Sequence, residues 1–182
     1  MMEINLKGND RGFSLVELSV VLAISAILAT MAIPMLTSSM HSMQLASDAR
    51  SIASTMTYAK LSSASLTTRC RLTFDIDNSQ WKLERRNPAT GNYELQEAIN
   101  QLSSGVADSG IIFKSNSSTS PPGFPKDSST VITFSSRGTL IEPSAGIGIV
   151  YISDDTEDYA VSVSASGKVQ IWRYRNSQWV AQ

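Results

Sequence analysis

The chain has 182 residues and a formal net charge of −1 at pH 7, and charged residues make up only 17% of it. Because this share is low for a soluble domain, we expect part of the chain to meet lipid or other subunits. The balanced charge excludes a global basic field, which confines any nucleic-acid site to a local patch. Cys70 and His41 are the only cysteine and histidine, so an intrachain disulfide and a His/Cys zinc site are excluded, and we expect no metal and no cofactor.

Residues 1–12 are short and polar, and they carry Lys7 and Arg11 just before a long apolar run. This run, residues 13–35, reads FSLVELSVVLAISAILATMAIPM and contains one charge, Glu17. As a helix its roughly 23 residues would be about 34 Å long, enough to cross a bilayer core of about 30 Å. The basic residues ahead of the run predict that residues 1–12 stay in the cytoplasm and that the remainder of the chain is exported.

Residues 36–66 predict an amphipathic continuation of the same helix. Their apolar residues recur at steps of three and four, while Asp48, Arg50 and serines occupy the other faces. These apolar residues are Leu36, Met40, Met43, Ala46, Ala49, Ala53, Met56 and Ala59. Because only one side of this half is apolar, it must pack on something, and the rest of the chain is the candidate.

From Arg69 onward the hydrophobic period becomes two, which is typical of half-buried strands. The alternation predicts a hairpin of strands around residues 70–76 and 81–84, and later strands at 131–135, 147–153, 159–165 and 168–174. The segment 93–114 is ambiguous between strand and short helix. Residues 115–129 are rich in serine and proline and predict a loop with too little apolar content to order itself. The fold class is therefore α+β: a long N-terminal helix, half membrane-spanning and half amphipathic, packed on a C-terminal antiparallel β-sheet or β-sandwich domain, residues 67–182.

The junction between Gly12 and Phe13 lies before the apolar run. A secretory signal peptide is cut after its apolar region, so cleavage at this junction would instead keep the helix in the mature protein. Glu17 is costly within an apolar run, which marks it as functional. The α-amino group freed on Phe13 would be largely cationic at neutral pH. Glu17 of one subunit could then face this amine on a neighbour, cancelling two charges that are costly apart and setting the axial register.

This arrangement resembles the class III signal of type IV prepilins, in which a short basic leader ends in glycine and is followed by phenylalanine and an apolar run with glutamate at its fifth position. The resemblance implies that a prepilin peptidase cuts after Gly12, that Phe13 becomes the N-methylated first residue, and that Glu17 is the fifth. Pro34 falls where many pilins carry a helix-bending proline. Since proline removes a helical hydrogen bond, local bending or melting is expected there.

Three further stretches look like the FimT/GspH-type minor pilins: YAKLSSASLTTRCRLTFD, ITFSSRGTL and VSVSASGKVQIWRYRNSQW. This resemblance implies a helix whose second half packs on two antiparallel β-sheets. It also implies a single-pass protein of the bacterial inner membrane with a periplasmic head, which then joins other pilins or pseudopilins in a type IV pilus or a type II secretion pseudopilus. The neighbouring genes, for pilus assembly or for secretion, would distinguish the two systems.

The alternative function is a pilus-associated minor pilin that binds DNA weakly during DNA uptake. Some FimT-type members bind DNA through a basic Gly-Arg-x-Arg pattern, which aligns here with residues 167–170, Gly-Lys-Val-Gln. Lys168 keeps the first positive charge, and Arg173 and Arg175 follow among aromatic residues that can stack on bases. The competing interpretation is a final β-strand whose arginines only solvate its end.

No side chains in the sequence suggest a nucleophile paired with a base, so we expect a protein that is not an enzyme. Cys70 shares its parity with apolar neighbours and is expected to be a small core residue. The acidic residues Asp154, Asp155, Glu157 and Asp158 match no EF-hand spacing and predict a hairpin turn.

Overall fold

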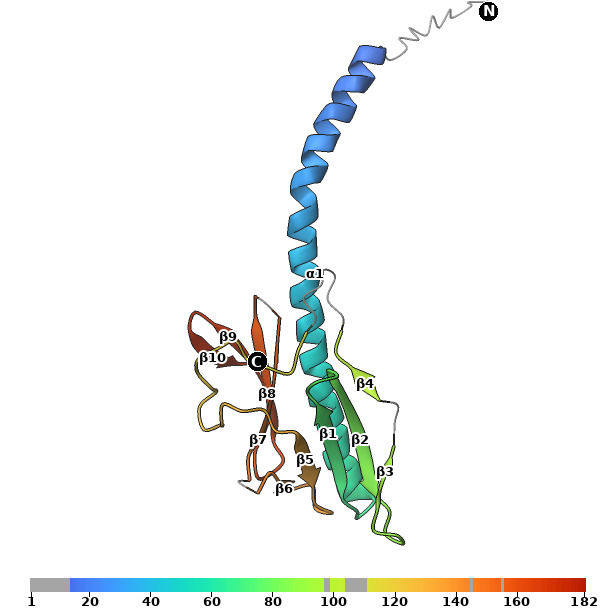
Figure 1. Cartoon of the computed structure of the whole chain (residues 1–182), viewed down its shortest axis with the longest axis vertical. Coiled ribbons are helices and arrows are strands. Elements are labelled where there is room, and N and C mark those ends of the chain that lie inside the picture. The colour runs from blue at the N-terminus through green and yellow to red at the C-terminus, as the bar shows by residue number, and fades with distance from the viewer. Residues whose placement is uncertain (1–13, 97–98, 104–110, 145, 155) are drawn as a thin grey trace, which may run out of the picture. The chain divides into compact units, whose positions relative to one another are not determined.

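The computed structural model describes residues 14–96, 99–103, 111–144, 146–154 and 156–182, with only the backbone described at residues 31–38 and 41 (Figure 1). One long helix, α1 (Leu15–Ser65), precedes ten strands. The chain divides into two compact units, residues 1–39 and 40–182. Nowhere in the described part of the chain does a helix combine the length and the hydropathy that a membrane span needs.

In the second unit, α1 buries one narrow stripe of apolar side chains. Its fully buried members recur at steps of four and three, which places them on one helix face: Leu45, Ala49, Ile52, Met56 and Ala59. Ala46 and Ala53 flank this stripe and are partly buried. The sequence prediction was wrong for Met40 and Met43, which are 43% and 72% exposed. It also missed Leu45 and Ile52, because several apolar faces of this small-residue helix fit the same spacing.

The first sheet is antiparallel and has six strands. In sequence they are β1 (Cys70–Asp75), β2 (Gln80–Arg86), β3 (Tyr93–Leu95), β4 (Asn100–Gln101), β5 (Val131–Phe134) and β6 (Leu140–Glu142). The strand order is β3-β2-β1-β5-β6, and β4 also pairs with β2. The predicted hairpin is confirmed, because Leu72 of β1 lies opposite Leu83 of β2.

The second sheet has four antiparallel strands in the order β10-β9-β8-β7. They are β7 (Gly148–Ser153), β8 (Asp158–Val163), β9 (Val169–Arg175) and β10 (Gln178–Ala181). The short strands β6 and β10 were not predicted, and β3 and β4 lie in the segment 93–114 that the sequence left open between strand and short helix, since two to four residues are too few to show a period of two.

One core joins the helix stripe to the inner faces of both sheets. Leu72, Leu83 and Phe134 come from the first sheet, and Val150 and Val161 come from the second. Cys70 also lies in this core and is 1% exposed, which confirms its predicted role as a small core residue. The predicted α+β class is therefore confirmed, with the second half of the helix packed on two antiparallel sheets.

The outer face of the second sheet carries a separate apolar cluster. Its buried members are Ile149, Tyr151, Ala160 and Trp179, and the partly buried Phe124, Trp172 and Tyr174 pack against them. Phe124 belongs to the loop at residues 115–129, which was predicted to be unable to order itself. The structure shows this segment as a loop, and it packs on the outer face of the second sheet, with the ring centroids of Phe124 and Trp172 6.3 Å apart.

Candidate assembly interface

The first unit presents an apolar helical surface that no other described residue of the unit covers. The large apolar side chains of its described residues are 50% to 83% exposed, and they point to all sides of the helix: Leu15, Val16, Leu18, Val20, Val21, Leu22, Ile24, Ile27 and Leu28. An exposed apolar patch of this extent is typical of a surface that meets lipid or other protein chains. The free energy gained by covering it is large, since each buried side chain of this kind contributes about 1.5–3 kcal/mol.

The described hydroxyl side chains of residues 15–30 bond to the backbone of the helix itself. Ser19 donates its hydroxyl to the carbonyl of Val16 at 2.7 Å, and Thr30 donates to the carbonyl of Ile27 at 2.7 Å. Ser25 makes the same kind of bond to the helix backbone. Because these hydroxyls need no outside partner, they can enter an apolar environment at low cost.

Glu17 is the one charged residue among residues 14–39, and it lies in the first turn of α1. A carboxylate is favoured there by the partial positive charge of the helix N-terminus. Its side chain is exposed, so it is available to a group from another chain. This part of the helix thus combines one negative charge in its first turn with a continuous apolar surface behind it.

The other predicted residues of this region lie partly outside the described residues. Gly12 and Phe13 are among those that the structure does not describe. At Pro34 only the backbone is described, and it is helical, so the local melting that we considered is not seen. The predicted membrane span at residues 13–35 includes these positions and stays a prediction.

The structure does not bring the predicted DNA-binding residues together. Lys168 precedes β9, whereas Arg173 and Arg175 lie near its end, about 17 Å and about 23 Å further along the strand at 3.3 Å per residue. Arg173 is already paired, since its guanidinium lies 2.5 Å from the carboxylate of Glu157. Glu157 also accepts a hydrogen bond from Ser42 of α1, at 3.2 Å. This pair therefore holds the β7–β8 turn to the helix.

The aromatic residues beside these arginines are also occupied. Tyr174 packs on Trp179 with ring centroids 5.2 Å apart, and Trp172 donates its indole N–H to the hydroxyl of Ser162 at 2.8 Å. Rings held in this way are poorly placed to stack on bases. DNA binding stays a prediction for this chain, and the geometry of β9 adds no support to it.

The acidic segment after β7 forms the predicted hairpin turn. Asp154 accepts hydrogen bonds from the backbone N–H groups of Thr156 and Glu157, at 2.8 and 2.6 Å. Asp158 accepts one from the backbone of Asn116, and burial raises the pKa of its carboxyl. Among the described residues, no group of three His, Cys, Asp or Glu side chains is placed to hold a metal ion.

Two family models match this chain, one at its N-terminus and one over most of the remainder. Residues 7–33 match the family model of the prokaryotic N-terminal methylation motif, and residues 48–167 match that of the type II transport protein GspH. The first match confirms the prediction of a prepilin-type N-terminus. The second covers well over half of the chain.

Two solved structures share the fold. The minor pseudopilin EpsH from the type 2 secretion system of Vibrio cholerae matches with a TM-score of 0.50 and 11% identity, over 76% of this chain and 97% of that chain. The type IV minor pilin FimU of Pseudomonas aeruginosa matches with a TM-score of 0.50 and 17% identity, over 75% and 92%. No curated protein sequence matches. At these identities the two structures support the fold alone.

Proposed function

The chain belongs to the family of the type II transport protein GspH, and we propose that it works as a minor pseudopilin or minor pilin in a type II secretion pseudopilus or a type IV pilus. The observation that carries this proposal is the helix of the first unit, which is apolar on all sides and exposed, with Glu17 alone charged in its first turn. The apolar surface of such a helix must be covered by lipid before assembly and by other subunits after assembly.

Proteolytic processing creates a positively charged partner for Glu17. The methylation motif at residues 7–33 spans the junction between Gly12 and Phe13. Cleavage there by a prepilin peptidase frees the α-amino group of Phe13, which is cationic at neutral pH. In the filament, this amine lies against Glu17 of a neighbouring subunit, where the surrounding helices exclude water and strengthen the attraction. The pair fixes how far one helix slides along the next, and Pro34 adjusts the path of the helix behind it.

Before assembly, the protein is held in the bacterial inner membrane by residues 13–35, with residues 67–182 in the periplasm. The run of apolar residues and the basic residues Lys7 and Arg11 ahead of it support this orientation. The amphipathic half of α1 then carries the head, because its buried stripe forms part of the head's own core.

Co-expression with a prepilin peptidase tests the proposal. We expect intact-mass analysis to show loss of residues 1–12 and a methylated Phe13, and we expect the processed protein in sheared filaments. A Gly12→Val variant should remain uncut and stay in the membrane fraction. Cleavage behind the apolar run instead, near Ala32, would overturn the proposal, because the helix would then be a discarded signal peptide.

A further inference from the structure

One side of strand β9 is only partly covered. On its first side, β8 pairs with β9 from Val169 to Arg173, whereas on its second side β10 pairs only with residues 172–175. Ahead of residue 172, this second side has no strand beside it among the described residues. An unpaired strand edge of this kind is a template on which an extended segment of another chain can pair.

The backbone of Val169 points to this open side. Alternate residues of an antiparallel strand direct their N–H and C=O groups to opposite neighbours. The carbonyl of Lys168 accepts the N–H of Ser164 on the β8 side, at 3.0 Å. The carbonyl of Ile171 accepts the N–H of Gln182 on the β10 side, also at 3.0 Å. Val169 shares the direction of Ile171, so it offers one donor and one acceptor to an incoming strand.

Helix α1 lies along this open edge, and the two enclose a groove of about 390 Å³, which we call the β9 groove. Its apolar lining comes from Ala53 of α1 and from Val169 and Ile171 of β9, which pack against the core but are only half-buried. The hydroxyls of Ser54 and Thr57 also line the groove, and each is bonded to the helix backbone at 2.8 Å. The helix wall therefore needs no polar partner, and the backbone of β9 supplies the free polar groups.

Two glycine turns meet at the end of the β9 groove where β9 begins. The first turn follows β5 and comprises residues 135–139, and the second follows β8 and comprises residues 164–168. A Cβ atom on Gly167 would lie only 2.3 Å from the carbonyl oxygen of Gly138, so the turns touch through their backbones. The aliphatic stem of Lys60 runs beside both glycines, at 3.1 Å and 3.2 Å from the Cβ positions that they lack. This contact holds Lys60 at the end of the groove.

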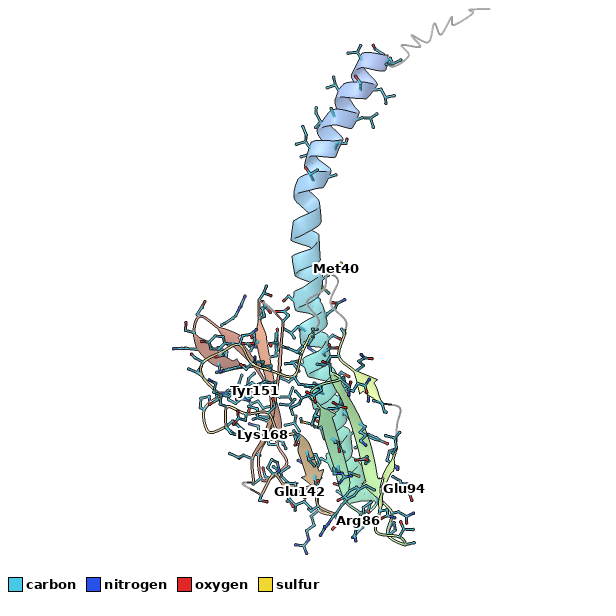
Figure 2. All side chains as sticks on the ribbon, viewed as in Figure 1. Met40, Arg86, Glu94, Glu142, Tyr151 and Lys168 are labelled. Atoms are coloured by element: carbon cyan, nitrogen blue, oxygen red, sulfur yellow. The ribbon has the colours of Figure 1, made fainter. Side chains whose placement is uncertain are left out.

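Two lysines make this end of the β9 groove positively charged. Lys168 lines the groove just before β9 (Figure 2), and Lys60 lies beside Gly167, the residue that precedes Lys168. Within the described part of the chain, neither ammonium group makes a hydrogen bond or an ion pair. A carboxylate that enters the groove would therefore meet two cations that have no other partner there.

We propose that the β9 groove binds an extended segment of a different filament subunit, which adds to β9 in line with β10 and carries a carboxylate toward Lys60 and Lys168. The inference rests on the proposed function, because a minor subunit is present in few copies and its neighbours are then other pilins. The incoming backbone would donate to the carbonyl of Val169 and accept its N–H, as in strand addition at a sheet edge. Exposed ion pairs contribute little affinity, so the lysines select the partner and its direction.

Site-specific photocrosslinking in the full-length chain tests this contact. The photoreactive amino acid p-benzoylphenylalanine replaces Ser54 on the helix wall, cells that assemble filaments are irradiated, and the linked peptide is identified in sheared filaments by mass spectrometry. We expect a peptide from the β-rich head of another pilin that contains Asp or Glu. Val169→Pro should reduce this link about tenfold, because proline lacks the N–H that the incoming strand needs but is tolerated at an open edge. Val169→Ala keeps the N–H and should retain the link.

Charge reversal provides a second test that leaves the backbone of β9 unchanged. Lys60→Glu/Lys168→Glu should also reduce the link about tenfold, because the incoming carboxylate is then repelled. Lys114→Glu/Lys126→Glu changes the net charge by the same amount at exposed positions of the loop and should leave the link unchanged. This pair of variants decides the matter if denaturant unfolding shows that Val169→Pro does not fold.

The possible results separate this inference from the proposed function. Processed protein in filaments without the link, or with a link that neither variant weakens, would overturn the inference while the proposed function stands. A linked peptide from a second copy of this chain, or from the N-terminal helix of another pilin, would also overturn it. So would an unchanged link in the lysine reversal that loses low-salt binding to duplex DNA. Absence of the processed protein from filaments would overturn the proposed function and the inference together.

Discussion

Asp48 of α1 accepts two hydrogen bonds from Ser103, one from the backbone N–H at 2.8 Å and one from the hydroxyl at 3.0 Å. The carboxylate is 7% exposed, so the helix holds the chain beyond β4 through a buried polar contact. Burial raises the pKa of Asp48 above its ordinary value of 3.8, and the hydrogen bonds from Ser103 oppose this only in part. The contact therefore links head stability to pH.

The sign of this pH dependence follows from the raised pKa. The folded state binds the Asp48 proton more tightly than the unfolded state does, so this group's contribution to the free energy of unfolding falls as the pH rises from 3.8 through the raised pKa. Asp48→Asn should remove that slope, as measured by denaturant unfolding of the detergent-solubilised protein at a series of pH values. Asp77→Asn, at an exposed position, is the control. An unchanged slope in Asp48→Asn would show that another group dominates.

Gly167→Ala should destabilise the second unit more than an ordinary left-handed glycine replacement does. Gly167 and Gly123 have φ values of +75° and +83°, but a Cβ on Gly167 meets the carbonyl oxygen of Gly138, whereas nothing lies within 4 Å of one on Gly123. We expect a loss of about 1 kcal/mol in Gly123→Ala from backbone strain. Gly167→Ala should lose about 2 kcal/mol more from the steric clash. Equal losses in denaturant unfolding would argue against a rigid contact between the two turns.

Tyr151→Phe should change the response to alkaline pH. The hydroxyl of Tyr151 donates to the carbonyl of Pro125 at 2.6 Å, and burial, with the nearby charge of Asp127, raises its pKa to about 12. Because the folded state keeps this proton longer, its contribution to stability falls as the pH rises from 10 through 12. The variant should lose about 1 kcal/mol near neutral pH and lack this alkaline decline. Unfolding curves recorded across this range would reveal an unaltered decline if the phenol were not its source.

Trp179→Phe should loosen the loop at residues 115–129. The indole N–H of Trp179 donates to the carbonyl of Thr119 at 3.0 Å, and phenylalanine keeps a ring in the cluster but loses this bond. We expect faster cleavage within the loop by a broad-specificity protease at low concentration. Trp172→Phe loses a comparable bond, to Ser162 within the sheet, and should not expose the loop. Similar cleavage of both variants would point to a general loss of stability.

Glu17→Ala should leave the protein in membranes but reduce its amount in sheared filaments. Removing a carboxylate from an apolar helix favours insertion, whereas the amine of Phe13 on a neighbour loses its partner. Glu17→Gln keeps the size without the charge and should behave in the same way. The ratio of filament to membrane protein measures the effect. Normal incorporation of both variants would exclude a role of the charge in setting register.

The sequence by itself determined the features that depend on local pattern. Residues 14–39 predict an apolar helix with Glu17 as its single charge, and the helix is observed from Leu15 onward. The alternation around Cys70 and Leu72 likewise predicted the first hairpin, since a half-buried strand repeats every two residues.

Only the tertiary structure decided the features that join distant segments. The face of α1 that is buried, with Leu45 and Ile52, depends on which sheets cover it. The loop at residues 115–129 has few apolar residues, but Phe124 becomes ordered because β7 to β10 offer it an aromatic surface. Gly138 and Gly167 are far apart in sequence, and their turns meet beside Lys60 because neither carries a side chain that would keep them apart.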